Sequence, residues 1–183
     1  AAVAAEEGFA DKVTMTIEQG IYGGIPAQGA IFGVASNPDA FLDESTQFDF
    51  YSGHGLDTTF LGLAQADAQG NVNVSKFGTT ISGSGGFIDI SQSAKKVVFC
   101  GTFDAKGSKI DVTPDGLHIA QSGQIPKLVT QVEKITFSAA YAQQSGQEVL
   151  YITERAVFQL TAEGVELIEI ASGVEIERDI LPY

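Results

Sequence analysis

The chain has 183 residues, a formal net charge of −13 and 44% hydrophobic residues. This length suffices for a domain with a sizeable core, and the apolar content excludes a disordered chain. No apolar run approaches a membrane span, and the scarcity of Lys and Arg argues against nucleic-acid binding, which needs a basic surface to neutralise phosphates. The single cysteine, Cys100, excludes an internal disulfide and lies in an apolar run, so we expect a buried, non-catalytic thiol and a cytoplasmic location.

The first third of the chain alternates short apolar stretches with glycine-rich turns. We expect a helix end over Ala1–Glu7, closed by Gly8, and a strand over Lys12–Ile17, because β-branched residues are enriched there. Further short elements are predicted, namely a strand over Ala30–Ala35, a helix over Ala40–Leu42 capped by Asn37–Asp39, and an apolar strand over Phe48–Tyr51 whose aromatic rings belong to the core.

The rest of the chain is rich in strand signals. Pro114-Asp115-Gly116 between two apolar runs is a strong hairpin signal. The expected strands are Phe60–Ala66, Asn71–Ser75, Val97–Phe103, Ile110–Val112, Leu117–Ile119, Val149–Thr153, Ala156–Thr161 and Val165–Ala171, with a helix or turn over Ile88–Ala94. Because helices are few, we predict an α/β fold with one continuous core. Its sheet should be open and mostly parallel, with helices and added antiparallel hairpins late in the chain.

Glu18 is the most informative candidate site residue. It follows a strand-like stretch and precedes a turn with glycine at positions 20, 23 and 24, which lets backbone pass close to a substrate. Ligands of open α/β sheets bind at the carboxyl ends of strands, so Glu18 is a candidate nucleophile. A surface turn with an ordinary glutamate is the alternative that the motif alone leaves open.

Several separated blocks together resemble the C-terminal, beta-type half of family I coenzyme A transferases, closest to the single-chain acetate or propionate type. Each block is weak alone, but their order and spacing are specific. The blocks are Glu18–Gly23 (Glu-Xaa-Gly-Xaa-Xaa-Gly), Gln47–Asp57, Leu61–Asp67, Gly70–Ser75, Gly83–Asp89, Tyr151–Phe158 and Leu167–Ala171.

The resemblance implies a coenzyme A transferase domain over 1–183 that carries the catalytic glutamate and belongs to a longer two-domain chain. It implies transfer of CoA between a short-chain acyl-CoA and a free carboxylate (the acetate, propionate, butyrate and acetoacetate class) through a glutamyl-CoA thioester on Glu18, with ping-pong character. Acyl-CoA is then a substrate, and no cofactor is bound permanently. The expected partners are an N-terminal transferase domain and, by family analogy, further copies of the chain.

Backbone amides of a glycine loop suit the oxyanion that such an attack creates, so Gly85 and Gly86 are candidate donors. Gly20 and Asn73 are candidates for contacts with CoA. Asn and Gln in turns more often hold the turn itself, and this alternative stays open for Asn73. Glu154-Arg155 between two strands is most simply a hairpin pair, although an interface role is open.

Other functions remain open at this level. They are a CoA-thioester hydrolase of the same superfold, a non-catalytic ligand-sensing or interaction domain, and, less favoured, a sugar-phosphate isomerase. No metal site is expected, because His54 and His118 are far apart and no Cys/His cluster exists.

Overall fold

The computed structural model describes residues 2–182. The chain divides into two compact units, and the boundary lies between Gly55 and Leu56. The large buried apolar cluster runs from Leu63 to Ile180 and therefore belongs to the second unit alone. The expectation of one continuous core is therefore wrong.

The first unit consists of short elements joined by glycine turns. Strands β1, β2 and β5 form an antiparallel sheet in the order β1-β2-β5, and β3 pairs with β4. Buried Ile17 and Ile21 are register partners, so they fix the β1–β2 hairpin from one side. The elements are α1 (Ala2–Glu6), η1 (Ala10–Lys12), β1 (Thr16–Ile17), β2 (Ile21–Tyr22), β3 (Ile25–Pro26), η2 (Gly29–Ile31), β4 (Ala35–Ser36), β5 (Ala40–Phe41) and α2 (Glu44–Ser52).

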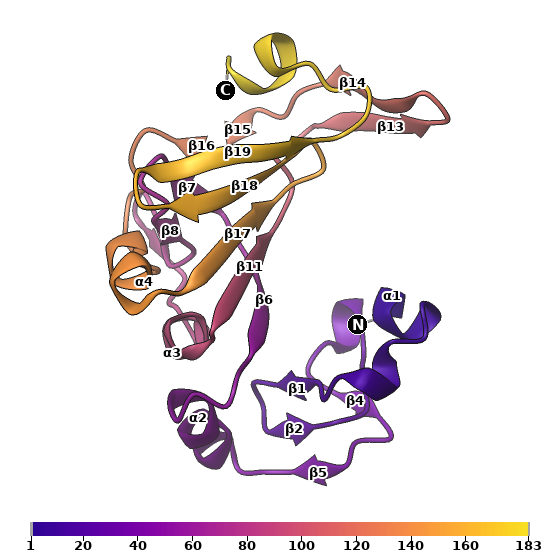
Figure 1. Cartoon of the computed structure of the whole chain (residues 1–183), viewed down its shortest axis with the longest axis vertical. Helices are drawn as coiled ribbons and strands as arrows, with labels where there is room; N and C mark the ends of the chain where they lie inside the picture. The colour runs from indigo at the N-terminus through magenta and orange to yellow at the C-terminus, as the bar shows by residue number, and fades with distance from the viewer. Residues whose placement is uncertain (1, 183) are drawn as a thin grey trace. The chain divides into compact units, whose positions relative to one another are not determined.

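The second unit is built on a five-stranded sheet with the strand order β19-β18-β17-β11-β6 (Figure 1). Its elements are β6 (Thr58–Gly62), β7 (Gln65–Asp67), β8 (Val72–Asn73), β9 (Lys76–Phe77), β10 (Thr80–Ile81), α3 (Phe87–Ser93), β11 (Lys96–Cys100), β12 (Asp104–Ala105), β13 (Lys109–Thr113), β14 (Gly116–Gln121), β15 (Ile125–Pro126), β16 (Leu128–Val129), α4 (Ala139–Ser145), β17 (Glu148–Ile152), β18 (Ala156–Thr161), β19 (Gly164–Ile170) and a π-helical turn, η3 (Ile176–Ile180).

The centre of this sheet is parallel and its far side is antiparallel. Strands β6, β11 and β17 run parallel, whereas β17, β18 and β19 follow one another as antiparallel hairpins. Val97, Val98 and Phe99 of β11 are all buried, as expected of a parallel strand covered on both faces. The α/β class with added late hairpins is confirmed, but the sheet is mixed and not mostly parallel, because β17–β18 and β18–β19 pair antiparallel. Outside this sheet, β7 and β16 also pair in parallel.

Aromatic rings fill the middle of the second unit. Phe99 stacks on Phe87 and on Tyr151, with ring centroids 5.8 and 5.4 Å apart, and Phe137 meets it edge-on at 5.0 Å. Such pairs add about 0.5–1.5 kcal/mol each beyond the area that they bury. This packing holds α3 and the parallel strands together.

Two predictions in the first unit chose the wrong type of element. Phe48–Tyr51 lies in helix α2, not in a strand, because the helix buries Gln47 and Tyr51, which are one turn apart. Tyr51 is buried as expected of a core ring, but Phe50 is 38% exposed. Ala40–Leu42 is not a helix: Phe41 of β5 pairs with Ile21, and the Leu42 amide donates to the Gly20 carbonyl.

Several other strand predictions were too long. Of Asn71–Ser75 only Val72–Asn73 is a strand, and the strand predicted over Val97–Phe103 ends at Cys100. Only Thr16–Ile17 of the stretch predicted over Lys12–Ile17 is a strand, and the stretch predicted over Ala30–Ala35 begins with the 3-10 turn η2 and reaches a strand only at Ala35. The stretch predicted over Phe60–Ala66 covers parts of two strands, β6 and β7, which belong to different sheets. Apolar composition marked these segments correctly, but the chain turns within them.

Candidate active site

Glu18 lies in a three-residue turn between β1 and β2, followed by Gln19 and Gly20. The Gly20 amide donates to the Ile17 carbonyl at 2.9 Å, which closes the turn. Gly20 has a φ of +96°, and a Cβ there would collide with the backbone of Leu42. The glutamate is half-buried, and the residues on both sides of the turn are buried, so the turn is anchored at both ends.

The strand before Glu18 differs from the one that the sequence suggested. It belongs to the small antiparallel sheet β1-β2-β5 and not to the parallel sheet of the second unit. Glu18 therefore does not lie at the carboxyl end of a parallel strand. Its candidacy now depends on the turn and on the family resemblance.

The two later glycines of this region face the protein's own chain. A Cβ on Gly23 would run into the Asp39 side chain, and one on Gly24 would lie 2.5 Å from the Ser36 carbonyl oxygen. Both residues have a φ above +70°. These glycines are therefore required for the local fold, whatever else passes near them.

The second glycine loop, Gly83–Gly86, leads into helix α3. Gly85 is exposed with a φ of +51°, and Gly86 is buried at the N-cap position of the helix. The Phe87 amide donates to the Ser84 carbonyl at 3.1 Å, and Phe87 itself packs on Phe99. The loop is thus held to the core of the second unit, and an oxyanion role for Gly85 and Gly86 stays a prediction.

Asn73 is fully buried and holds a turn. Its amide nitrogen donates to Gln65 Oε1 and to the Lys76 carbonyl, both at 2.7 Å, and its Oδ1 accepts from the amides of Ser75 and Lys76. Both polar atoms of its side chain are therefore engaged within the second unit. This arrangement favours the turn-holding alternative, and a contact with CoA stays a prediction.

Arg155 forms a buried polar cluster that the sequence did not reveal. Its side chain is 0% exposed, and Nη2 lies 2.5 Å from Asp104 Oδ2, while Nη1 donates to the Asp179 carbonyl at 3.1 Å. The guanidinium carbon lies 4.5 Å from the centre of the Phe103 ring. The adjacent Glu154 accepts from the Phe103 amide at 2.8 Å. Glu154-Arg155 therefore ties the hairpin between β17 and β18 to the segment after β11.

Cys100 contradicts the expectation of a buried thiol. It ends β11, beside Gly62 of β6 and Ile152 of β17, and the residue is exposed. Partial covering of the sulfur raises the pKa of the thiol above its ordinary value. A raised pKa lowers the thiolate fraction, so Cys100 is a weak nucleophile at neutral pH.

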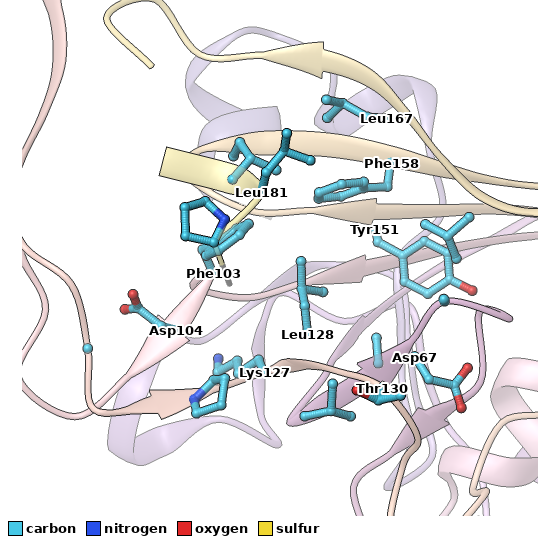
Figure 2. Close-up of a pocket in the computed structure, with 18 of the residues that line it drawn as sticks. Asp67, Phe103, Asp104, Lys127, Leu128, Thr130, Tyr151, Phe158, Leu167 and Leu181 are labelled. Carbon is cyan, nitrogen blue, oxygen red and sulfur yellow. The ribbon is translucent and has the colours of Figure 1, made fainter. Parts of the chain in front are cut away.

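A cavity of about 940 Å³ opens in the second unit, and none of the residues predicted from the sequence as catalytic or CoA-binding lines it. Leu128, Phe158 and Leu181 approach this space from three different segments (Figure 2). Most of its lining side chains are apolar. No sequence pattern signalled it, because its walls come from segments that are more than 100 residues apart along the chain.

Within residues 2–182, no group of three or more His, Cys, Asp or Glu side chains could hold a metal ion. No helix that the structure describes has the length and apolar character that a membrane crossing requires.

The chain is similar in sequence to two CoA-transferases. The chain is 50% identical to the acetate CoA-transferase YdiF of Escherichia coli K12 over 98% of its own length, and 46% identical to the caffeate CoA-transferase of Acetobacterium woodii over 99%. The crystal structure of the YdiF apoenzyme from E. coli O157:H7 matches 99% of the chain with a TM-score of 0.92. The chain is homologous to coenzyme A transferases. The resemblance to family I that its sequence suggested is confirmed.

The match covers only part of those relatives. The chain spans about a third of their length, 34% of YdiF and 35% of the caffeate enzyme. No protein-family model matches the chain. The decarboxylase AibA/AibB shares the fold at 19% identity and a TM-score of 0.56, so the fold alone does not determine the chemistry.

Proposed function

We propose that this chain carries the nucleophile of a coenzyme A transferase, which moves CoA between a short-chain acyl-CoA and a free carboxylate. The observation that supports the proposal most is the 46–50% identity to two CoA-transferases along nearly the whole chain. A crystal structure of YdiF described as a thioester complex with CoA also matches the chain, with a TM-score of 0.90. Glu18 is the proposed nucleophile.

The proposed reaction needs only carboxylates and thioesters. The Glu18 carboxylate attacks the thioester carbonyl of acyl-CoA, releases the CoA thiolate and forms a mixed anhydride. The thiolate attacks the glutamyl carbonyl, which forms the glutamyl-CoA thioester and frees the first acid as its carboxylate. A second carboxylate then reverses both steps and leaves as the new acyl-CoA, while Glu18 returns as a carboxylate. The thioester bond energy is thus conserved and not lost to water.

The geometry of the β1–β2 turn suits a nucleophile. The turn is closed by the Gly20–Ile17 hydrogen bond and anchored by buried Ile17 and Ile21. An anchored turn limits the positions that the Glu18 carboxylate can take, which reduces the entropy lost when it attacks. Its half-buried position leaves part of the side chain accessible to a substrate.

Backbone amides are the proposed stabilisers of the negative charge that develops on attack. Gly85 and Gly86 are the candidates, because glycine presents its amide without a side chain in the way. Gly20 and Asn73 are the proposed residues for binding CoA. Asn73 is buried, so its contribution would be to hold the turn that meets CoA. Loss of one oxyanion donor raises a barrier by about 2.7–4 kcal/mol.

Further parts of the proposal concern the rest of the protein. An N-terminal transferase domain would supply the remaining wall of the site, since the relatives are about three times as long as this chain. A homo-oligomer is the proposed assembly. The exchanged acids are proposed to be short-chain carboxylates, as the name of the acetate CoA-transferase suggests.

The test uses the full-length protein and acetyl-CoA without an acceptor acid. After quenching and digestion, the peptide that contains Glu18 should gain the mass of CoA less one water. Glu18→Ala should lose this adduct, and Glu44→Ala, a control at another glutamate of the same unit, should keep it. If the Glu18 peptide stays unmodified while acetyl-CoA remains intact, the proposal is wrong.

A further inference from the structure

The hairpin formed by β3 and β4, residues 25–36, presents an apolar tip beside the candidate nucleophile. Its strands pair through Ile25 with Ser36 and through Pro26 with Ala35. The Ala27 amide then donates to the Val34 carbonyl at 2.9 Å, so the pairing extends toward the tip.

The tip exposes three large apolar side chains that are almost consecutive. Ile31 is 65% exposed, Phe32 is 68% exposed and Val34 is 53% exposed. A single exposed apolar residue is ordinary, but a group on one short tip marks a surface that meets something apolar. None of the three takes part in the buried cluster of the second unit.

The tip of this hairpin lies beside the turn of Glu18. Gly33 lies so close to Gln19 that a Cβ on Gly33 would be 3.6 Å from the Gln19 Cδ and Nε2 atoms. Gln19 is the residue next to Glu18. Gly33 has a φ of +110°, a conformation that glycine adopts without strain, and its chain neighbours Phe32 and Val34 are the exposed apolar residues of the tip.

An apolar neighbour would favour the proposed chemistry at Glu18. An acyl group joined to the Glu18 carboxylate as an anhydride extends a hydrocarbon chain from that carboxylate and is readily hydrolysed. An apolar wall beside it would shelter the anhydride from water and would limit the size of the acyl group. The two relatives carry the names of acids of very different size, acetate and caffeate, although both are 46–50% identical to this chain. Overall identity therefore does not decide acyl size, and local side chains must.

We propose that Phe32 at this tip forms a wall of the acyl site and restricts the enzyme to small acyl groups. This inference rests on the proposed function, because it needs the acyl group to be attached at Glu18. Phe32 touches the substrate and not the reacting atoms, so it sets specificity without taking part in the bond changes. Ile31 and Val34 extend the same apolar surface.

The test compares acyl groups in the full-length enzyme. We measure kcat/KM for acetyl-CoA and for 3-phenylpropanoyl-CoA in the wild type, Phe32→Ala and Phe32→Leu. Phe9→Ala is the matched control, because it deletes another half-exposed phenylalanine ring (52% exposed) of the same unit. Pocket size typically changes such a ratio by 10–200-fold, so Phe32→Ala should shift it by about tenfold toward the larger acyl group. Phe32→Leu should shift it in the same direction but less.

Hydrolysis provides a second readout. The fraction of acyl-CoA that is lost to water in the presence of acetate should rise in Phe32→Ala and stay unchanged in Phe9→Ala. If the CoA adduct forms on Glu18 and both readouts of the two Phe32 variants stay within twofold of wild type, the wall assignment is wrong while the proposed function stands. If the wild type forms no adduct, the proposed function fails, and the wall assignment fails with it.

Discussion

Asp104→Asn is the sharpest test of the buried polar cluster, because it removes one charge and keeps the shape of the side chain. Asp104 and Arg155 have side chains that are 2% and 0% exposed, and their charged atoms lie 2.5 Å apart. Removing one partner of a buried pair costs about 3–5 kcal/mol, since the other charge stays buried. Glu154 Oε1 lies 3.4 Å from Arg155 Nε and compensates in part, so we expect the lower end, about 3 kcal/mol.

The assay is urea unfolding of the variants, followed by circular dichroism and extrapolated to zero urea. Lys95→Ala is the control, because the Lys95–Asp57 pair is exposed (67% and 86%) and should contribute less than about 1 kcal/mol. The double variant Asp104→Leu with Arg155→Met removes both charges and should lose less stability than Asp104→Asn. If Asp104→Asn costs no more than Lys95→Ala, the reasoning about this cluster is wrong.

Two further predictions concern a glycine and a tyrosine. Gly24→Ala should lower the free energy of unfolding by about 1–3 kcal/mol, because the φ of Gly24 is +72° and the new Cβ would meet the Ser36 carbonyl. The control is Gly29→Ala, which should cost less, because Gly29 has a φ of +63° but open space around it. Equal losses of stability in urea unfolding would contradict this prediction. Tyr151→Phe should cost about 1–3 kcal/mol, because the buried hydroxyl donates to the Gly70 carbonyl. Burial and the nearby Asp67 raise the pKa of Tyr151 well above that of the unfolded chain, so its stabilisation is complete below about pH 10 and is lost above it. A tyrosinate absorbance titration that shows Tyr151 ionising near pH 10 in the folded protein would refute this.

The second unit could largely be predicted from the sequence. Its elements are signalled locally. Pro114-Asp115 forms the turn between β13 and β14, with Gly116 as the first residue of β14. The continuous apolar run at Val97–Phe99 marks a strand buried on both faces. These signals lie within a few residues of each other along the chain. Local chemistry was therefore sufficient for them.

The first unit was harder to predict because its elements are short and tertiary contacts decide them. Phe48–Tyr51 has the aromatic content of a strand, yet α2 forms because it buries Gln47 and Tyr51 on one face, and Tyr51 donates to the Thr16 hydroxyl at 2.9 Å. Ala40–Phe41 pairs with β2, about twenty residues earlier in the chain. These partners lie too far away along the chain to be recognised from a short stretch of sequence.

The candidate site shows the same division. The Glu18 turn was visible as a carboxylate followed by glycines, and the structure places it in a closed turn. The burial of Arg155 was invisible, because its partners Asp104 and Asp179 are 51 and 24 residues away in sequence. Nothing in the pair Glu154-Arg155 itself distinguishes a buried ion pair from an exposed hairpin turn.

The most direct test of the central claim is a single turnover of the CoA adduct. The full-length enzyme is loaded with acetyl-CoA, freed of excess substrate and then mixed with propionate. If Glu18 is the nucleophile, its adduct disappears while one equivalent of propionyl-CoA appears. Release of free CoA without propionyl-CoA would indicate hydrolysis, and an adduct that persists or lies on another residue would contradict Glu18 as the nucleophile.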